Sequence, residues 1–405
     1  MGHEGGESAI EELFRTSSRP ALAQLIRIFG DIDVAEDALQ DAYVVALRDW
    51  SNAGVPAFPH AWVLRVARHR GIDRLRRESL GRALLADAIR EQPEIQVHDA
   101  DGAQPVGDDQ LRLIFTCCHP ALSAEGRVAL SLRLLCGLQT HQIARAFLIE
   151  ESTMAQRIVR AKRKIKDGPI PYRVPATTEL PARLPAVLSV LYLVHNAGAY
   201  RPRVPGDLCT EAIRLTRELL ALLPDEPEIA GLLSLLLLSQ SRRDARMSPE
   251  GSLVRLTDQD RSLWDRALIE EGQELLRGCL RRDTPGPYQW QAAIQAVHAD
   301  ACTVEQTDWP QILSIYDQLF SATRSPVVAL NRAIARAEVD GDEAALRDID
   351  VLPLANYYLF HATRGELLQR LGRLPESTAA YRRAHALAPE GPERDYLNRR
   401  LTPSD

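Results

Sequence analysis

Residues 151–168 read ESTMAQRIVRAKRKIKDG and contain every lysine of the chain. Four apolar residues recur at steps of four, three and four, the spacing of one helical face: Met154, Ile158, Ala161 and Ile165. The opposite face is cationic. Glu151, Ser152 and Thr153 are expected to cap this helix, and Gly168 is expected to end it. By itself the stretch fits either a DNA-contacting helix or an ordinary solvated surface helix.

A short helix is predicted just before this basic helix. In LQTHQIARAFLI, residues 138–149, Thr140 can cap a helix whose apolar residues have the same periodicity, and a tight turn follows near residues 148–151. A short helix, a three- to four-residue turn and a basic second helix have the spacing of a helix-turn-helix motif. The second helix of such a motif presents its N-terminal half to the DNA major groove. We therefore expect residues 108–167 to bind DNA.

Two oppositely charged helices are predicted in the N-terminal segment, residues 8–80. DIDVAEDALQDAYVVALRDW, residues 31–50, carries an acidic face and packs inward through four residues: Val34, Ala38, Ala42 and Ala46. PHAWVLRVARHRGIDRLRRE, residues 59–78, is expected to bury Trp62, Val66 and Ile72 and to project its arginines outward. An acidic surface beside a basic, aromatic-bearing one suggests one protein contact and one nucleic-acid contact.

The remaining chain is also predicted to be helical, so the fold class is all-α. Residues 81–107 form a polar, Gly-containing linker, and the Pro-rich stretch 168–175 marks a domain boundary. Within residues 176–405, the segment LLQRLGRLPESTAAYRRAHALAP, residues 367–389, resembles a tetratricopeptide (TPR) repeat. Three earlier helical pairs are expected to stack with it as a TPR-like α-solenoid: 211–245, 263–302 and 309–338.

Composition limits the possible function classes. The chain has 405 residues, which predicts two or three domains, and a net charge of −6, so DNA must be met by local basic patches. The N-terminus has no apolar targeting segment, and no apolar run approaches the roughly 18 residues of a membrane span. We expect a cytoplasmic protein with no membrane contact.

No catalytic, metal or cofactor site is predicted. The six cysteines are too sparse for a disulfide scaffold. Adjacent helical side chains point about 100° apart, so Cys117, Cys118 and His119 are expected to be packed residues rather than metal ligands. The phosphate-binding loop, the nucleophile elbow and the zinc-protease helix motif are all missing from the sequence. We expect no enzyme.

Together these segments resemble the extracytoplasmic-function (ECF) sigma factors of the sigma-70 family. AEDALQDAYVVAL is similar to the family's polymerase-clamp helix, AWVLRVARHRGIDRLRR to its −10-reading helix, and the region from LRLIFTCCHPAL to MAQRIVRAKRKI to its −35-reading domain. FTCCHPAL, ARAFL and MAQRIVRAKRKI resemble one branch in particular, whose members carry a C-terminal TPR-like extension. The resemblance implies a sigma region 2 at 8–80, a region 4 at 108–167 and a regulatory helical domain at 176–405.

The resemblance also implies residue roles and partners, namely core RNA polymerase, through its β′ clamp and β flap, and promoter DNA. The residues implied to bind polymerase are Asp33, Glu36, Asp37, Gln40 and Asp41. Those implied to bind the −10 element are Trp62, Arg65, Arg68, His69, Arg76 and Arg77. Those implied to bind the −35 element are Thr153, Gln156, Arg157, Arg160, Lys162, Arg163 and Lys164.

Two positions depart from the family pattern. His69 stands where the family usually has Asn, which bears on −10 base preference. LYLVHNAGAY, residues 191–200, stands where this branch usually reads close to LYLVFNEGY, so His195 occupies a position usually held by Phe.

Two other functions fit parts of the sequence. A helix-turn-helix regulator with a TPR sensor domain, acting without polymerase, would explain 108–167 and 176–405 but not the acidic and basic N-terminal helices. An enzyme or small-molecule-binding scaffold would use the C-terminal helices alone. In the sigma-factor interpretation, the helical tail modulates activity in cis and offers a surface for a regulatory protein or ligand. A positive requirement for the tail is favoured, because the tail has no long acidic run that could mask the basic helix.

Overall fold

A computed structural model describes residues 18, 20–86, 106–147, 149–168, 170–176, 178–199, 207–249 and 251–401. Over this part of the chain, regular structure is helical, and the one β pairing is an isolated antiparallel bridge between Met247 and Leu253. The predicted all-α class is confirmed. Most of the predicted linker, residues 87–105, lies outside the described residues.

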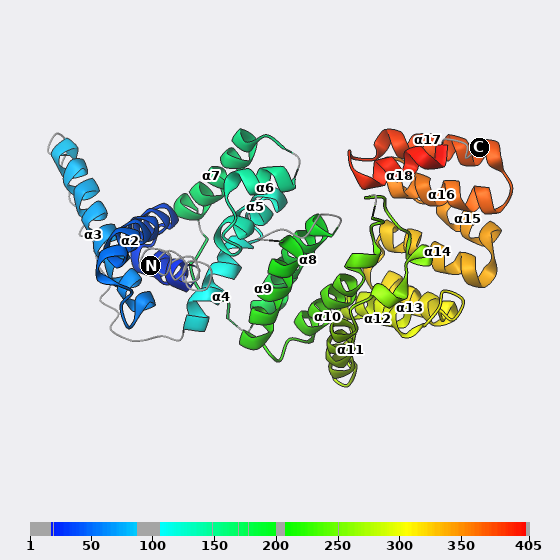
Figure 1. The fold of residues 1–405 in the computed structure, drawn as a ribbon, viewed down its shortest axis with the longest axis horizontal. Coiled ribbons are helices and arrows are strands. Elements are labelled where there is room, and N and C mark those ends of the chain that lie inside the picture. The colour runs from blue at the N-terminus through cyan, green and yellow to red at the C-terminus, as the bar shows by residue number, and fades with distance from the viewer. Residues whose placement is uncertain are drawn as a thin grey trace. The chain divides into compact units, whose positions relative to one another are not determined.

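The chain divides into two compact units, Met1–Val194 and His195–Asp405 (Figure 1). The division lies inside one helix, downstream of the Pro-rich stretch where the sequence predicts a boundary. None of the described helices combines the length and apolar character needed to cross a membrane.

The first unit begins with helical residues 20–29 and continues with helices on both sides of the linker. They are α2 (Ile32–Ala53), α3 (Pro59–Ala86), α4 (Val106–Cys117), α5 (Ala124–Leu134), α6 (Thr140–Ala146), α7 (Glu151–Asp167) and α8 (Leu180–Gly198), the last of which runs into the second unit. The helix α2 begins at Asp31, whose carboxylate accepts hydrogen bonds from the backbone N–H groups of Asp33 (2.9 Å) and Val34 (3.2 Å). It ends at Gly54, where φ is 80°. The predicted inward stripe of α2 is buried, as expected.

The helix α3 differs from its prediction in two ways. It extends to Ala86 rather than ending near residue 78. Its buried positions are Val63, Ala67 and Gly71, whereas Trp62, Val66 and Ile72 are only partly covered. Gly71 explains the shift, since a Cβ atom built there would lie 2.1 Å from the ring of Phe29. The small residues of α3 therefore let the first described helix, residues 20–29, approach closely.

The helices α6 and α7 confirm the predicted helix-turn-helix spacing, but their caps differ from the prediction. Thr140 is the first residue of α6 rather than its cap, and the backbone N–H of Gln139 donates instead to Oε1 of Gln142 (2.8 Å). The helix α7 starts after Glu150, which makes no side-chain cap hydrogen bond. Its apolar stripe is buried as predicted at Met154, Ile158 and Ala161.

The first unit also buries the paired cysteines. Cys117 and Cys118 are both buried, and Sγ of Cys118 lies 3.5 Å from Oγ of Ser131. Burial raises the pKa of the Cys118 thiol to about 11. These thiols are therefore protonated core groups at neutral pH.

The second unit is a series of helices in which neighbours along the chain pack together, from green to red in Figure 1. They are α9 (Leu208–Leu222), α10 (Pro227–Ser241), α11 (Arg266–Leu280), α12 (Pro287–Asp300), α13 (Trp309–Thr323), α14 (Pro326–Asp340), α15 (Asp342–Asp350), α16 (Tyr358–Arg370), α17 (Leu374–Leu387) and α18 (Pro392–Leu401). In the predicted TPR-like unit, Gly372 turns the chain with φ of 75°, and a Cβ atom built at Gly365 would lie 3.1 Å from the ring of Tyr381. Packing of most helices against their chain neighbours is solenoid behaviour.

Acid should destabilise the second unit through His195. This side chain is 1% exposed, and burial, with Arg246 nearby, lowers its pKa to about 4. In the unfolded chain this histidine binds a proton near pH 6.5, whereas in the folded chain it stays neutral until about pH 4. The stability that is present at neutral pH is therefore lost as pH falls from about 6.5 to about 4. The expected loss from His195 is roughly 2 kcal/mol at pH 5, measured by hydrogen exchange in α9 and α10.

The control for this effect is His195→Phe, the residue usual at this position in the branch that the chain resembles. Phe fills similar volume and does not titrate, so its acid sensitivity should be smaller. His298, which is also buried with a pKa lowered to about 4, should leave a residual loss in both proteins. Equal loss of protection in the two proteins between pH 7 and pH 5 would show that His195 is not responsible.

Candidate functional site

The surface of α2 is exposed around its middle. Gln40 and Asp41, two of the predicted polymerase contacts, are solvent-exposed. Beside them at helical spacing lie Val44, 60% exposed, and Leu47, 44% exposed. The sequence interpretation missed these two apolar residues, although they fall on the face opposite the buried alanines. The result is a mixed acidic and apolar face of the kind that protein partners bury.

Near its N-terminus the acidic face of α2 already has partners. Nζ of Lys162 lies 2.7 Å from Oδ1 of Asp33 and also pairs with the Glu36 carboxylate. Asp37 pairs with Arg74 of α3, with 2.5 Å between Oδ2 and Nη1. The predicted polymerase residues thus form two groups. Gln40 and Asp41 are exposed to solvent, whereas Asp33, Glu36 and Asp37 form ion pairs within the chain.

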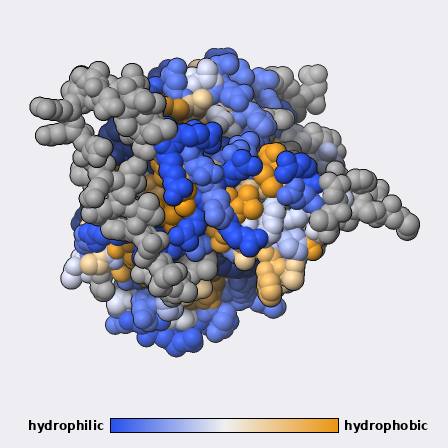
Figure 2. Space-filling view, turned by 90° about the vertical axis from the view of Figure 1, so that its left-hand side faces the viewer, coloured by the Kyte–Doolittle hydropathy of each residue, from blue (hydrophilic) through white to orange (hydrophobic). Residues whose placement is uncertain are grey.

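The helix α3 presents the basic surface that its sequence predicts. The exposed predicted −10 residues are Arg65, Arg68, His69, Arg76 and Arg77. Trp62 is half-buried because its ring packs on Trp50, with 5.3 Å between ring centroids. The turn before α3 adds Phe58, 78% exposed, and Val55, 42% exposed, which the sequence interpretation also missed. Seen from the side of α2 and α3, apolar residues interrupt a largely hydrophilic surface (Figure 2).

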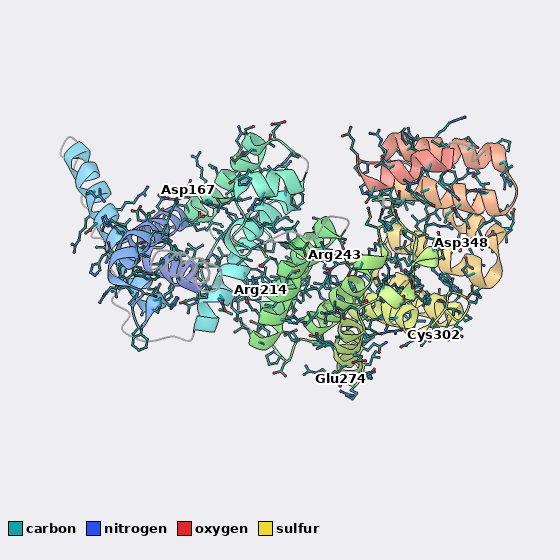
Figure 3. All side chains as sticks on the ribbon, viewed as in Figure 1. Asp167, Arg214, Arg243, Glu274, Cys302 and Asp348 are labelled. Carbon is teal, nitrogen blue, oxygen red and sulfur yellow. The ribbon has the colours of Figure 1, made fainter. Side chains whose placement is uncertain are left out.

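The helix α7 exposes one polar face. Thr153, Gln156, Arg160 and Arg163 are exposed at helical spacing, and Arg157 is half-buried. Nη2 of Arg160 donates to Oε1 of Gln156 (3.3 Å), and Nε of Arg163 donates to Oδ2 of Asp167 (3.2 Å), which lies at the end of α7 (Figure 3). Intrahelical hydrogen bonds of this kind hold planar guanidinium groups along the helix surface, a geometry suited to phosphate and base edges.

Lys162 and Lys166 of α7 lie on a different side from this face, whereas Lys164 is exposed at helical spacing from Arg160. The side chain of Lys162 is 15% exposed. Burial alone would lower its pKa, but Glu36 and Asp33 outweigh burial and raise the pKa. Lys164 donates to the backbone carbonyl of Ala121, and Nζ of Lys166 lies 2.6 Å from Oδ2 of Asp31. The sequence interpretation placed Lys162 and Lys164 among the −35 contacts, whereas both engage groups of the same unit here.

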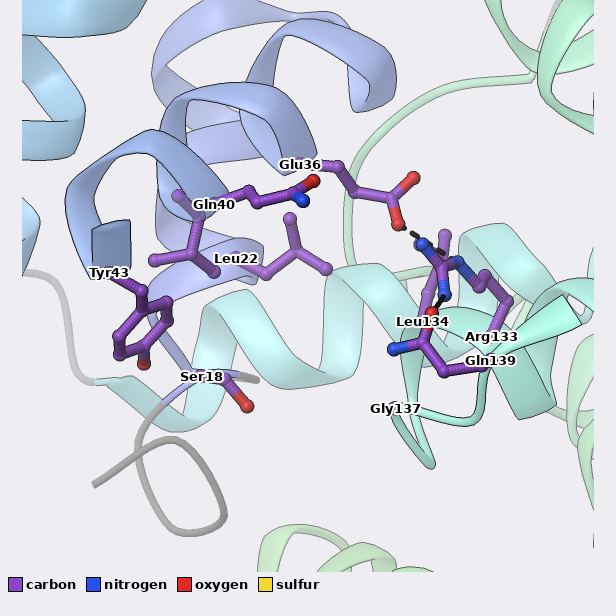
Figure 4. A pocket seen from close by; sticks show the side chains of 10 residues that line it. Ser18, Leu22, Glu36, Gln40, Tyr43, Arg133, Leu134, Gly137 and Gln139 are labelled. Atoms are coloured by element: carbon purple, nitrogen blue, oxygen red, sulfur yellow. Dashed lines mark hydrogen bonds and ion pairs between the residues drawn. The ribbon is translucent and has the colours of Figure 1, made fainter. Parts of the chain in front are cut away.

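A pocket lies between α2 and the segment that joins α5 to α6. Glu36, Gln40 and Tyr43 line it from α2, and Arg133 and Gln139 line it from the other side (Figure 4). Nε of Arg133 lies 3.2 Å from Oε1 of Glu36, and its Nη1 donates to Oε1 of Gln139 (2.8 Å). Burial raises the pKa of the Tyr43 hydroxyl, which stays protonated. The acidic helix and the helix-turn-helix therefore contact one another directly.

Family models match three parts of the chain. The model for sigma-70 region 2 matches residues 13–80, and the model for sigma-70 region 4 matches residues 112–165. A family of unknown function, DUF6596, matches residues 183–280. The first two matches cover the acidic and basic N-terminal helices and the helix-turn-helix described above.

Two relatives are similar to this chain in sequence, one over almost its whole length and one over about a third of it. An uncharacterized protein of Rhizobium meliloti (strain 1021) is 44% identical over 402 residues, which cover 96% of this chain and 95% of that protein. A protein of Mycobacterium tuberculosis (strain ATCC 25618 / H37Rv), described as a probable ECF RNA polymerase sigma factor SigI, is 32% identical over 146 residues. That alignment covers 36% of this chain and 50% of that protein.

Proposed function

The chain belongs to the ECF sigma factors of the sigma-70 family and carries a C-terminal helical extension, and on this basis we propose how its surfaces divide promoter recognition. It is an RNA polymerase sigma factor that directs promoter-specific transcription initiation, so its partners are core RNA polymerase and promoter DNA. The observation that carries the proposal is the presence of both sigma-70 regions in one chain, each with an exposed face of suitable chemistry. The chain acts in the cytoplasm as a non-enzymatic polymerase subunit.

The polymerase contact is assigned to the exposed middle of α2. Gln40 and Asp41 supply polar contacts to the β′ clamp, and Val44 and Leu47 supply apolar area that becomes buried on binding. An acidic rim around an apolar centre suits a partner surface with cationic residues, because complementary charge speeds encounter and fixes orientation. The helix-turn-helix domain additionally faces the β flap.

The −10 contact is assigned to α3 and the turn before it. Its exposed arginines track the phosphates of a melted strand, and Trp62 with Phe58 offers aromatic faces to unstacked bases. His69 lies on the same exposed surface, where a ring in place of the usual amide changes the hydrogen bonds offered to a base. This chemistry suits single-stranded DNA.

The −35 contact is assigned to the exposed face of α7. Thr153 and Gln156 lie in its N-terminal half, which enters the major groove in helix-turn-helix docking, and Arg160 follows just past the middle of the helix. Arg157 and Arg163 extend the contact to neighbouring bases or phosphates. The role of Lys162 and Lys164 in this contact depends on their release from their partners within the unit.

Gel filtration with core polymerase tests the assignment of function. A sigma factor forms a stoichiometric complex with core polymerase before any DNA is added. A polymerase-independent regulator, the alternative function considered from the sequence, binds its operator alone and leaves core polymerase unaltered. Co-elution at a one-to-one ratio supports the proposal, and separate elution at micromolar concentrations contradicts it.

We also propose that the C-terminal helical unit acts in cis and is required for full activity. The segment that leads into the C-terminal unit belongs to the first unit. Within it, Oη of Tyr172 donates to the carbonyl of Ala23 (2.8 Å), and Nη2 of Arg183 donates to the carbonyl of Phe115 (2.9 Å). A truncation that removes the C-terminal unit without disturbing the first unit therefore keeps Tyr172 and Arg183. The solenoid surface is available to a regulatory protein or ligand.

A chain that ends after Gly198, the last residue of α8, should support several-fold less transcription from a cognate promoter than the full chain does. Core polymerase binding should stay largely intact, because the α2 face and both matched sigma regions remain. The measurement is a transcription assay of both proteins at equal soluble concentration, with a parallel core pull-down. Higher output from the shortened chain would instead identify the tail as an inhibitor.

A further inference from the structure

A long connection joins α10 to α11 in the second unit. The two helices pack against each other, and the backbone N–H of Asp265 donates to the carbonyl of Ser241 (2.9 Å), so the base of the connection is closed. Helix–helix connections in bundles are usually about 2–8 residues long, whereas this one comprises residues 242–265. The turn between the helices does not need most of these residues, and their contacts indicate another role.

One end of the connection is firmly anchored. Trp264 is 4% exposed, and the guanidinium of Arg261 lies 4.8 Å from the centroid of its ring. Nη1 of Arg261 donates to the carbonyl of His298 (2.8 Å) and to that of Ala301, at the C-terminal end of α12. The last carbonyl groups of a helix have no partner within it, so Arg261 satisfies groups that α12 leaves open.

The middle of the connection reaches a carboxylate on α16. Residues 253–256 read Leu-Val-Arg-Leu, are all half-buried, and are called the tip. The backbone of Arg255 is extended, with φ of −67° and ψ of 155°. Its Nη1 donates to Oε1 of Glu366 (3.0 Å), which lies 111 positions further along the chain. The connection therefore contacts both α12 and α16, which are not neighbours in the helix order (Figure 1).

The carboxylate of Glu366 is oriented by three helices. Oη of Tyr381 in α17 donates to Oε2 of Glu366 (2.8 Å), and Arg400 of α18 pairs with the same carboxylate. Tyr381 is 3% exposed, and the guanidinium of Arg400 lies 5.3 Å from the centroid of its ring. A carboxylate that is fixed in this way offers a directional, charge-assisted hydrogen bond to an arginine.

The pair between the tip and α16 can exchange partners. The side chains of Arg255 and Glu366 are 40% and 33% exposed, and ion pairs of such exposure are weak. When they separate, Asp258 still accepts from Nε of Arg255 (2.8 Å), while Tyr381 and Arg400 still hold Glu366. Separation therefore leaves neither charge without a partner, and the tip can leave while Trp264 stays buried.

We propose that the surface of α16, α17 and α18 around Glu366 is a binding site for an extended peptide that carries an arginine between aliphatic residues. The tip occupies this site as an internal ligand, and its sequence shows which side chains fit. A partner protein with an exposed segment of this pattern displaces the tip. This inference rests on the proposed regulatory surface of the solenoid. Its test measures peptide binding alone, so its failure would leave the sigma-factor assignment intact.

Peptide binding to the full chain tests the site directly. The probe is a fluorescein-labelled peptide, SLVRLTDQ, which has the sequence of residues 252–259. Leu253→Ser, Arg255→Ser and Leu256→Ser together empty the site and keep the length of the connection. The emptied chain should bind the peptide about tenfold more tightly than the wild-type chain, whose own tip competes at an effective concentration on the order of millimolar.

Two comparisons test the chemistry of the site. A peptide with alanine in place of its arginine should bind the emptied chain about tenfold more weakly, because it lacks the hydrogen bonds to a charged group. Glu366→Gln, added to the emptied chain, should weaken binding of the unaltered peptide several-fold, because it removes the charge but keeps an acceptor. Glu376→Gln removes a carboxylate of α17 that pairs with Arg373, and it should leave peptide binding unchanged.

Hydrogen exchange in the otherwise unaltered chain provides a second measurement. The backbone N–H groups of Val254 and Asp258 donate to backbone carbonyls within the connection. Glu366→Gln should raise their exchange rates several-fold, because the tip is no longer held by charge. The control Glu376→Gln should leave both rates unchanged, and excess peptide should raise them in the wild-type chain.

The inference is overturned if the emptied chain does not bind the peptide, if the wild-type chain binds it equally well, or if the arginine-free peptide binds as tightly. Unchanged exchange at Val254 and Asp258 in Glu366→Gln also overturns it. Should the emptied chain lose its helical circular dichroism, the exchange measurement decides alone.

Discussion

Val44→Asp combined with Leu47→Asp should lower the affinity for core polymerase by two orders of magnitude or more. Both side chains are exposed in the free chain, at 60% and 44%, so the fold should tolerate the change. In the complex the new carboxylates would lie at the centre of the α2 interface, where a buried unpaired charge is costly and central residues carry about 2 kcal/mol or more each. A pull-down of core polymerase across a concentration series measures the loss.

The matched control places the same two new charges elsewhere. Val351→Asp combined with Leu280→Asp changes two residues of the second unit that are 81% and 58% exposed, and it should leave core binding unaltered. A loss that appears equally in the control would point to general repulsion or misfolding. Undiminished core binding by the double variant would remove the α2 face from the polymerase contact.

Arg160→Ala combined with Arg163→Ala should weaken promoter binding by holoenzyme by roughly 1–3 kcal/mol for each arginine that contacts a base, and by less for one that contacts a phosphate. Both residues lie on the exposed face of α7, away from the apolar stripe that packs inward, so the effect should appear in DNA affinity rather than stability. The measurement is a titration of promoter DNA at physiological salt, repeated on a promoter with an altered −35 element. A base contact should lose part of its discrimination between the two promoters.

A second pair of exposed arginines provides the control. Arg382→Ala with Arg383→Ala removes the same total charge from α17, and it should change promoter affinity little. Unchanged affinity in the α7 double variant, with the salt dependence also unchanged, would exclude these arginines from the DNA contact.

The spacing of apolar residues predicted the helices well, because a helix that buries one face repeats apolar residues at helical spacing within its own sequence. The apolar stripes of α2 and α7 are buried as expected, since alanine, valine and isoleucine at helical spacing leave one inward orientation. The prediction of the inward face of α3 was wrong by about one position. There the inward face is set by Gly71, which has no side chain and so leaves room for the ring of Phe29. A pattern of hydrophobic residues does not reveal such a position.

Pairings between distant segments were beyond sequence reasoning. Lys162 and Glu36 are 126 positions apart, and the basic residues of α7 looked equally suited to DNA. Only the ion pairs of Lys162 and Lys166 with Asp31, Asp33 and Glu36 separate these two lysines from the exposed arginine face of α7. Similarly, Val44 and Leu47 resemble ordinary core residues in the sequence, and their exposure depends on which face of α2 the neighbouring helices cover.

Run-off transcription with purified core polymerase tests the central claim most directly. The full chain, added to core polymerase with promoters found by chromatin immunoprecipitation, should yield transcripts of defined length that core polymerase alone does not make. Altering either the −10 or the −35 element should reduce them. If transcripts do not depend on the chain, although it binds the same promoter DNA without polymerase, the sigma-factor account is contradicted.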